Sequence, residues 1–378
     1  VATKLAQQNP SLNDEQLYQQ ARAVVIAEIQ AITYNEWLPA LLGPAGLKPY
    51  HGYDPKVNPG VTNEFSTAGF RFGHSMLGDD IEFLGNDGIP VAEEVSLSEA
   101  FFNPNLVREN NIDPILKYLA SDPSSEIDTK VVDSVRNFLF GPPGAGGLDL
   151  VSLNIQRGRD HGLADYNTTR AAYGLPRLTD FNQITHDVEL QQKLRDLYGN
   201  INNIDLWVGA LAEDHLKGAS VGPLLQRIIS DQFERVRDGD RFWYQNTFSG
   251  AQLRELECTS LADVIRRNTG TTNLQDNVFF FRVGLGGQVF DDGAAARRRP
   301  GPARARRAAR RDVPRLRPPR AGLGPRGRHR CRDAGGAGRG LRGGPGGGAG
   351  RRLAALRRRA CGAFGSRQPS GHPPLRAA

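Results

Sequence analysis

The stretch from Val61 to Leu77, VTNEFSTAGFRFGHSML, decides how the rest of the chain is interpreted. Its pattern predicts a helix over Thr62–Gly78. Thr62 or Asn63 can cap the N-terminus, and a glutamate follows in the first turn, where the helix dipole favours an acidic side chain. The candidate site is built on this helix.

One face of this helix combines apolar, imidazole and guanidinium side chains. Phe65, Phe70 and Leu77 recur at helical spacing and predict an apolar stripe. His74 lies on the same face, and Arg71 lies one turn before it. An imidazole beside a guanidinium on an apolar wall suits a planar, apolar, anionic cofactor. A single histidine on an apolar face is more often a core residue than a ligand, so this stretch alone leaves both interpretations open.

A second stretch, Leu153–Gly162 with the sequence LNIQRGRDHG, strengthens the cofactor interpretation. It follows directly on the apolar run LDLVSL. Asn154, Arg157, Arg159 and Asp160 place several forked hydrogen-bonding groups beside that run. A solvated surface helix rarely has this composition, so the stretch indicates a site for anionic groups.

Six motifs together resemble a known family. FRFGHS and LNIQRGRDHG occur with four further motifs, ITYNEWLPALLG (Ile32–Gly43), DLWVGALAE (Asp205–Glu213), GDRFWYQN (Gly239–Asn246) and SLADVIRRNTG (Ser260–Gly270). In their order and spacing they resemble the animal-type haem peroxidases of the peroxidase–cyclooxygenase superfamily, over roughly Val1–Phe281. The resemblance implies a mainly α, haem peroxidase-like helical domain.

The resemblance assigns roles to four residues. His74 matches the proximal haem-iron ligand, and Asn154 matches the asparagine that accepts the second N–H of that imidazole. Such an acceptor fixes the tautomer of a ligating histidine and tunes its basicity. Arg71 and Arg157 match arginines near the haem propionates, which guanidinium groups bind through paired hydrogen bonds.

The remaining polar residues of the second stretch have structural interpretations. Arg159 and Asp160 are expected to form an ion pair, and His161 to cap or pack against its helix. The other histidines lie outside the motifs and are expected to be surface or core residues: His51, His186 and His215.

The distal side of the family's site has no counterpart in this sequence. In the family, a distal histidine and arginine activate peroxide, an acidic pair can form ester links to haem, and a calcium loop lies nearby. The chain starts at Val1 without an initiating methionine. We therefore expect an N-terminally truncated chain with the proximal half of the site, no distal catalytic residue, and calcium only in the full-length protein.

Three functions are compatible with these motifs. The first is a haem peroxidase that uses hydrogen peroxide to oxidise a small donor such as a halide, a phenol or another organic molecule. The second is a haem-dependent fatty-acid dioxygenase, which needs a catalytic tyrosine in a lipid channel, and no tyrosine here has that context. The third is a non-catalytic haem-binding remnant with a nucleic-acid-binding tail. The resemblance also implies an extracellular or secreted protein.

The charge of the chain divides it into two segments. The formal net charge is +7, from 48 basic and 41 acidic side chains. Residues 291–378 hold 24 Arg and 4 Asp, a net charge of +20, so residues 1–290 hold 24 basic and 37 acidic side chains, a net of −13. We expect a haem peroxidase domain over residues 1–290 and a low-complexity basic tail over 291–378.

The tail is rich in Arg, Gly, Pro and Ala and lacks Lys, Glu, Asn, Ile, Thr, Tyr, Trp and Met. One interpretation is a shifted reading frame in a GC-rich gene. The other is a disordered basic arm that binds nucleic acid or anionic membrane. Cys331 and Cys361 lack zinc-ligand spacing, and Cys258 is the only cysteine before the tail, so no disulfide framework is expected within residues 1–290.

The remaining elements follow from periodicity and caps. A long helix is expected from Asn13 toward Pro39, with Gln16 completing a capping box. Its apolar face is predicted from Leu17, Ala21, Val24, Val25, Ile29 and Ile32. Loops are expected at 44–59 and 78–90, helices at 97–102, 113–120, 127–140, 188–198, 221–236 and 261–267, and a strand at 278–283. No apolar run is long enough to span a membrane.

Overall fold

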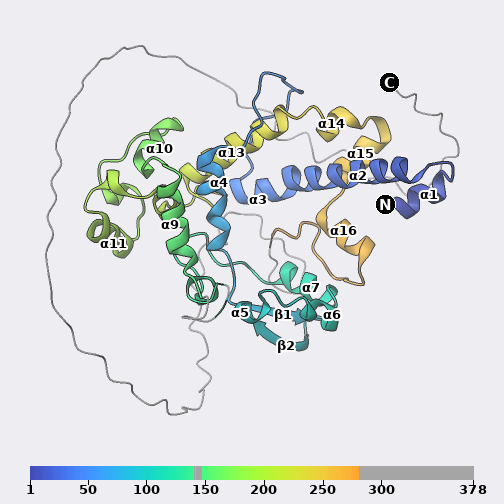
Figure 1. The fold of residues 1–378 in the computed structure, drawn as a ribbon, viewed down its shortest axis with the longest axis horizontal. Helices are drawn as coiled ribbons and strands as arrows, with labels where there is room; N and C mark the ends of the chain where they lie inside the picture. The colour runs from blue at the N-terminus through green and yellow to red at the C-terminus, as the bar shows by residue number, and fades with distance from the viewer. Residues whose placement is uncertain (140, 142–146, 281–378) are drawn as a thin grey trace, which may run out of the picture. The chain divides into compact units, whose positions relative to one another are not determined.

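The computed structural model describes residues 1–139, 141 and 147–280. Within these ranges the chain is mainly helical, and its strands form a single two-stranded sheet (Figure 1). The predicted fold class is therefore confirmed. The predicted domain boundary at residue 290 and the basic tail lie outside the described residues, so both stay predictions.

The N-terminal segment is mainly helical, and its helical path is nearly continuous over residues 14–42. It comprises α1 (Ala2–Gln8), α2 (Asp14–Ile32), the π-helical turn η1 (Thr33–Trp37) and α3 (Leu38–Leu42). Asn13 and Gln16 form the predicted capping box. Pro39 was predicted to end the helix, but the helical path continues through it. It stands in the first turn of α3, after the wider π-helical turn, where a missing N–H is tolerated.

The buried face of α2 differs from the predicted one. Ala27 and Ala31 are fully buried against Trp243, Tyr244 and Leu256 of the segment around α14 (Tyr244–Thr247) and α15 (Gly250–Cys258). Of the six positions predicted to form the buried face, Val25 and Ile29 are exposed. The prediction was wrong because large aromatic partners pack closely on small alanines, which a count of bulky apolar residues does not detect.

A β-hairpin begins within residues 78–90, which were predicted to be a loop, and extends beyond them. β1 (Asp80–Leu84) pairs antiparallel with β2 (Pro90–Ser96), with Asp80 opposite Ser96 and Leu84 opposite Pro90. The strands carry several acidic side chains, and few of their residues are buried. The alternation of apolar and polar residues that identifies a strand is therefore weak here.

Short helices follow the hairpin. They are α5 (Leu97–Ala100), α6 (Asn105–Asn110), α7 (Asp113–Ser121) and α8 (Asp133–Arg136). The helix predicted at 113–120 is confirmed. The helix predicted at 127–140 is wrong over its described residues, 127–139, because α8 is the only helix that forms there.

The remaining helices run from α9 onward. They are α9 (Leu150–Asp160), α10 (Tyr166–Ala172), η3 (Phe181–Gln183), α11 (Val188–Tyr198), η4 (Ile201–Asn203), α12 (Leu206–Ala212), α13 (Pro223–Asp238), α14, α15 and α16 (Leu261–Asn268). The helices predicted at 188–198, 221–236 and 261–267 are confirmed to within two residues. The predicted strand at 278–283 is wrong where it is described, since residues 278–280 form a turn in which the side chain of Asn277 accepts from the N–H of Phe279. Residues 281–283 lie outside the described residues.

A buried polar cluster joins α10, α12 and α13. The Tyr166 hydroxyl donates to Glu213 Oε1 at 2.8 Å, Arg170 forms an ion pair with the same carboxylate, and the backbone N–H of Leu224 donates to Glu213 Oε2 at 2.7 Å. Burial raises the pKa of the Glu213 carboxyl. A Cβ atom on Gly209 would lie 2.3 Å from the Tyr166 ring, so only glycine permits this approach of α12 to α10. The cluster fixes α12, on which the site described next depends.

Candidate functional site

His74 lies at the end of a short 3₁₀ turn. This turn, η2 (Gly69–His74), follows the single helical turn α4 (Asn63–Thr67), so the one helix predicted over Thr62–Gly78 was wrong. Thr62 does cap α4 as predicted, accepting from the N–H of Phe65. The backbone breaks at Ala68, with φ −132° and ψ −60°. The change of helix type turns His74 out of the register that a continuous α-helix would give it.

Two neighbouring helices hold η2 in place. A Cβ atom on Gly69 would lie 2.5 Å from the Ile228 side chain, so α13 packs directly on the backbone at the start of the turn. Trp207 of α12 is buried, and its Nε1–H donates to the carbonyl oxygen of Arg71 at 3.3 Å. The backbone that carries Arg71 and His74 is thereby held by contacts with both helices. Figure 1 shows α4, which precedes η2, beside α13.

Asn154 brings three of the predicted site residues together. It lies on α9, which Asp149 caps by accepting from the backbone N–H groups of Val151 and Ser152. The Asn154 side chain is buried, with Nδ2 2.8 Å from His74 Nδ1 and Oδ1 2.9 Å from Arg71 Nη1. Residues 80 positions apart in the sequence thus share one hydrogen-bonded network.

The environment of His74 favours its neutral form. Burial lowers the pKa of the imidazole, and the positive charge of Arg71 lowers it further, while the bond to Asn154 acts in the opposite direction. Among the described residues Nε2 has no hydrogen-bond partner. A neutral imidazole binds a metal ion through its unprotonated ring nitrogen, so Nε2 can serve as a ligand atom when the ring proton lies on Nδ1.

Arg71 and Arg157 form an unbalanced pair of cations. Burial lowers the pKa of Arg71, and the charge of Arg157 lowers it further. Within the described part of the chain neither guanidinium has a carboxylate within 4.0 Å, although most arginines that the structure describes on α13 and α16 do. Two adjacent cations without a counter-charge suit a ligand that carries two carboxylates.

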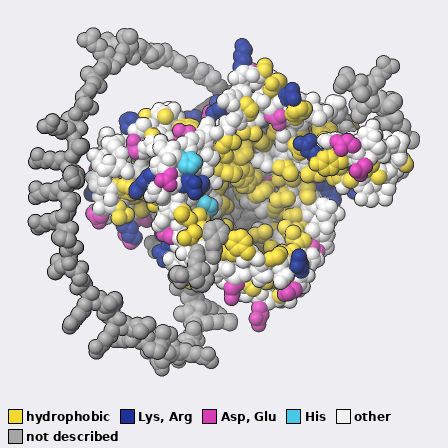
Figure 2. Space-filling view, viewed as in Figure 1, with side chains coloured by type: hydrophobic (Ala, Val, Ile, Leu, Met, Phe, Trp, Pro, Cys, Tyr) yellow, Lys and Arg dark blue, Asp and Glu magenta, His cyan; other side chains and the backbone are white. Residues whose placement is uncertain are grey.

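An aromatic surface adjoins these polar groups. Phe70 stacks on Phe65 with ring centroids 4.7 Å apart and contacts Trp37 and Phe233 at their edges or at a tilt. Phe70 nevertheless remains 44% exposed. On the face that Figure 2 displays, apolar side chains gather around a hollow, with histidine and basic side chains at one edge of it. A neutral imidazole, two unbalanced cations and an exposed aromatic wall fit a planar, apolar dicarboxylate such as haem.

The other polar residues of α9 are only partly as predicted. Arg159 does not pair with Asp160. It donates two hydrogen bonds of 2.9 and 2.8 Å to the carboxylate of Asp205, the residue that precedes α12. Asp160 instead accepts from Gln156, one turn earlier. His161 ends α9, and its Nδ1 lies 3.1 Å from Asn63 Oδ1, consistent with the predicted capping or packing role.

The remaining histidines are surface or partly buried residues, as predicted. His186 is exposed and pairs with Asp214. His215 is partly buried between Glu126 and the carbonyl of Ile127. Burial lowers the pKa of its imidazole, but the hydrogen bonds to Glu126 and Ile127 outweigh that effect and raise the pKa overall. His51 is exposed. The residue to which the sequence analysis gave no role is Trp207, although it stands in the motif DLWVGALAE as the one aromatic residue of α12.

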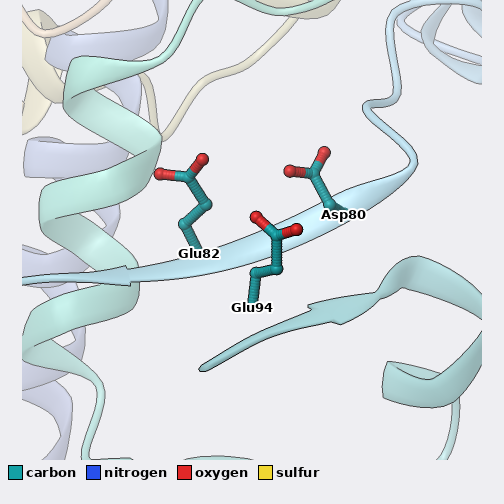
Figure 3. Close-up of side chains that lie close together, drawn as sticks. All are labelled: Asp80, Glu82 and Glu94. Carbon is teal, nitrogen blue, oxygen red and sulfur yellow. The ribbon is translucent and has the colours of Figure 1, made fainter. Parts of the chain in front are cut away.

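A second cluster of ionisable side chains lies on the hairpin, away from α9. Asp80 and Glu82 of β1 and Glu94 of β2 bring carboxylate oxygens within 4.8 Å of one another (Figure 3). Burial raises the pKa of Glu82, and the charges of Asp122, Asp80 and Glu94 raise it further. These contacts identify mutual repulsion but no ligand. None of the described helices is long and apolar enough to cross a membrane.

Comparison with protein families gives one extended match. Residues 1–279 match the family described as animal haem peroxidase. Among curated proteins, peroxinectin A of Dictyostelium discoideum is 41% identical over 280 residues, which cover 74% of this chain and 52% of that protein. Mouse thyroid peroxidase is 43% identical over 288 residues, covering 72% of this chain and 31% of that protein. The chain thus spans about half, or less, of the length of these relatives.

Solved structures show the same relationship. Peroxidase A from Dictyostelium discoideum superimposes with a TM-score of 0.69 at 41% sequence identity, covering 73% of this chain and 53% of that chain. Two structures of a fatty acid alpha-dioxygenase from Oryza sativa superimpose with TM-scores of 0.60 and 0.59 at 20% identity, covering 70% of this chain and 52% and 51% of the solved chains. The second likeness shows a shared fold alone.

Proposed function

Because this chain belongs to the animal haem peroxidase family, we propose that it binds haem with His74 as the proximal iron ligand and serves a peroxidase reaction. The single observation that supports this most is the network of His74, Asn154 and Arg71, in which a half-buried neutral imidazole is held through one nitrogen. When bound, haem supplies the redox chemistry for reducing peroxide. The protein's residues bind and orient it.

Each site residue has a defined task in this proposal. His74 presents Nε2 to the iron, and Asn154 holds the other ring nitrogen. Arg71 and Arg157 bind the two propionates, and each charge-assisted bond contributes roughly 1.5–3 kcal/mol net. The exposed ring of Phe70 offers an apolar surface beside them.

The proposed reaction oxidises a small donor with hydrogen peroxide. Halides, phenols and other small organic molecules are the donor classes that the resemblance suggests. We infer that the residues of this chain supply the proximal side of the site, because the family's distal histidine and arginine motifs have no counterpart in its sequence. Any calcium site of the family is assigned to that distal side. An extracellular location is proposed on the resemblance alone.

A fatty-acid dioxygenase is the alternative, supported by the shared fold. It requires a tyrosine that can form a radical beside the haem and the lipid. Tyr166 is the most deeply buried tyrosine described, and its hydroxyl is hydrogen-bonded to Glu213 and Arg170 in the buried polar cluster. These bonds argue against that role. A haem-binding protein without activity, with the tail binding nucleic acid, is the third outcome.

Titration of the purified chain with haem, followed by peroxide and a phenolic donor, tests the proposal. We expect one haem per chain by Soret absorbance and loss of that binding in His74→Ala. His186→Ala is the matched control, since its imidazole is exposed and distant in sequence from the motifs. Binding without turnover supports the proximal-side assignment, whereas turnover with a fatty acid and oxygen supports the dioxygenase. Unchanged haem stoichiometry in His74→Ala would contradict the ligand assignment.

A further inference from the structure

We propose that Arg71 sets the orientation of the Asn154 amide, and that capture of a ligand carboxylate by Arg71 releases this amide so that His74 can present Nε2 to iron. The inference rests on the proposed haem-binding function and deepens it. Arg71 is then a positioning residue as well as a propionate partner, because it acts on His74 through Asn154.

The orientation of the amide follows from the chemistry of its partners. A guanidinium has only N–H donors, so the end of the amide that lies 2.9 Å from Arg71 Nη1 must be the oxygen. The amide nitrogen therefore faces His74 Nδ1, at 2.8 Å. Since that nitrogen donates, Nδ1 must accept, and the proton of the neutral imidazole resides on Nε2.

This arrangement does not suit iron binding. A ring nitrogen that carries a proton has no lone pair for a metal ion, so ligation through Nε2 needs the proton on Nδ1. An N–H at Nδ1 in turn needs an acceptor, which the amide oxygen becomes if the Asn154 side chain rotates by half a turn. One proton leaves Nε2 for solvent and one joins Nδ1 from solvent, so the charge of the imidazole is unchanged.

Arg71 opposes that rotation. With the amide reversed, its NH₂ group would face the donors of Arg71, leaving both without an acceptor. Apart from the bond to Asn154, the Arg71 guanidinium makes one described hydrogen bond, from Nε to the carbonyl of Ser66 at 3.2 Å. Trp207 holds the backbone of Arg71, so only its side chain needs to move. A carboxylate bound between Arg71 and Arg157 would supply the missing counter-charge and draw the guanidinium away from Asn154.

Nitrogen-15 NMR of the histidine side chains in the haem-free chain tests this inference, at a pH above 7 where the imidazole is neutral. We expect the wild-type His74 to carry its proton on Nε2. In Arg71→Met the Nδ1 resonance should shift toward the protonated position, since neither amide orientation is then imposed. Asn154→Asp offers two acceptor oxygens and should place the proton on Nδ1. Arg157→Met removes a neighbouring charge that does not bond to Asn154, so it should leave the wild-type tautomer unchanged.

A second arm separates carboxylate capture from iron binding. Iron-free protoporphyrin IX has the two carboxylates but no metal, and it should shift the His74 tautomer to Nδ1–H in the wild-type chain. Its dimethyl ester should not. A wild-type His74 that already carries its proton on Nδ1, or an Arg71→Met variant with the wild-type tautomer, overturns the inference. Failure of every porphyrin to bind counts against the proposed function instead, and the ligand-free variants still decide the present inference.

Discussion

Two arginine-containing regions of this molecule differ in whether a carboxylate of the described chain balances their positive charge. In the buried polar cluster that joins α10, α12 and α13, Arg170 forms an ion pair with Glu213. The Tyr166 hydroxyl and the N–H of Leu224 donate to the same carboxylate and complete its hydrogen bonding. Beside His74, Arg71 and Arg157 lie close enough to repel each other and have no described carboxylate partner.

The difference separates structural charges from charges that await a ligand. A buried cation without a partner would destabilise the fold strongly. In the buried polar cluster, the chain itself supplies the carboxylate that pairs with Arg170. The pair near His74 tolerates an unmet charge because it is partly solvated. Functional sites commonly break a local rule that the rest of the fold obeys. The comparison therefore predicts that removing charge from the two regions will have different consequences.

Arg170→Met should have the largest effect on stability. It leaves the buried Glu213 carboxylate without its cation, and breaking a buried ion pair costs about 3–5 kcal/mol. Urea unfolding followed by far-UV circular dichroism measures the change. Arg71→Met is the matched variant and should cost less, about 1–2 kcal/mol, because it removes two hydrogen bonds, to Asn154 and to Ser66, and leaves no buried charge unpaired. Equal losses in both variants would remove the distinction between the two regions.

Arg157→Met should weaken binding without weakening the fold. It removes a guanidinium that has no described partner and relieves its repulsion of Arg71, so the free energy of unfolding should stay the same or rise slightly. Haem affinity should fall by at least about tenfold, the equivalent of one charge-assisted bond. Soret titration beside urea unfolding gives both quantities. A clear loss of stability at unchanged haem affinity would show that Arg157 stabilises the fold, as Arg170 is expected to do, and does not bind haem.

Gly209→Ala tests how tightly α12 packs on α10 at the buried polar cluster. The new methyl group would meet the Tyr166 ring at 2.3 Å, and forcing extra volume into a packed core costs about 1–3 kcal/mol. Gly73→Ala is the control, because a Cβ there meets nothing within 4 Å even though it precedes His74. Thermal unfolding of the two variants compares them directly. A stable Gly209→Ala variant would mean that α10 and α12 can move apart at little cost.

Glu82→Gln should have the smallest effect, and it probes unmatched charge of the opposite sign. The folded-state pKa of Glu82 lies above its ordinary value of 4.5, so the folded chain takes up this proton before the unfolded chain does as the pH falls. The ionised carboxylate is therefore destabilising at neutral pH. The variant should be more stable than the wild type at pH 7, by less than about 1 kcal/mol, because the partly exposed carboxylate is screened by solvent. The difference should vanish below about pH 4.5, and a variant that is less stable at pH 7 would contradict the assignment.

The sequence allowed candidate site residues to be named, but it did not allow their geometry to be predicted. His74, Asn154, Arg71 and Arg157 stand in long motifs, and the structure brings His74, Asn154 and Arg71 into one network. Their roles toward haem remain predictions. The break at Ala68 could not be foreseen, because it accompanies packing of Ile228 against Gly69 from a helix about 160 positions away.

Partner choice over long distances explains most of the other errors. Arg159 was assigned to the adjacent Asp160, yet Asp205, 46 positions away, offers two oxygens in the right geometry. The strands β1 and β2 were missed because acidic side chains obscure their alternation. Helices with strong caps and regular apolar spacing, such as α11 and α16, were predicted closely because local sequence determines both of these signals.

The most direct test of the central claim is resonance Raman spectroscopy of the ferrous haem complex in the wild-type and His74→Ala chains. The wild type should show an iron–imidazole stretching band. The band should be absent in the variant and should return when free imidazole is added, because the added base fills the vacated position. An unchanged band in His74→Ala would show that another residue ligates the iron and would contradict the account of the site.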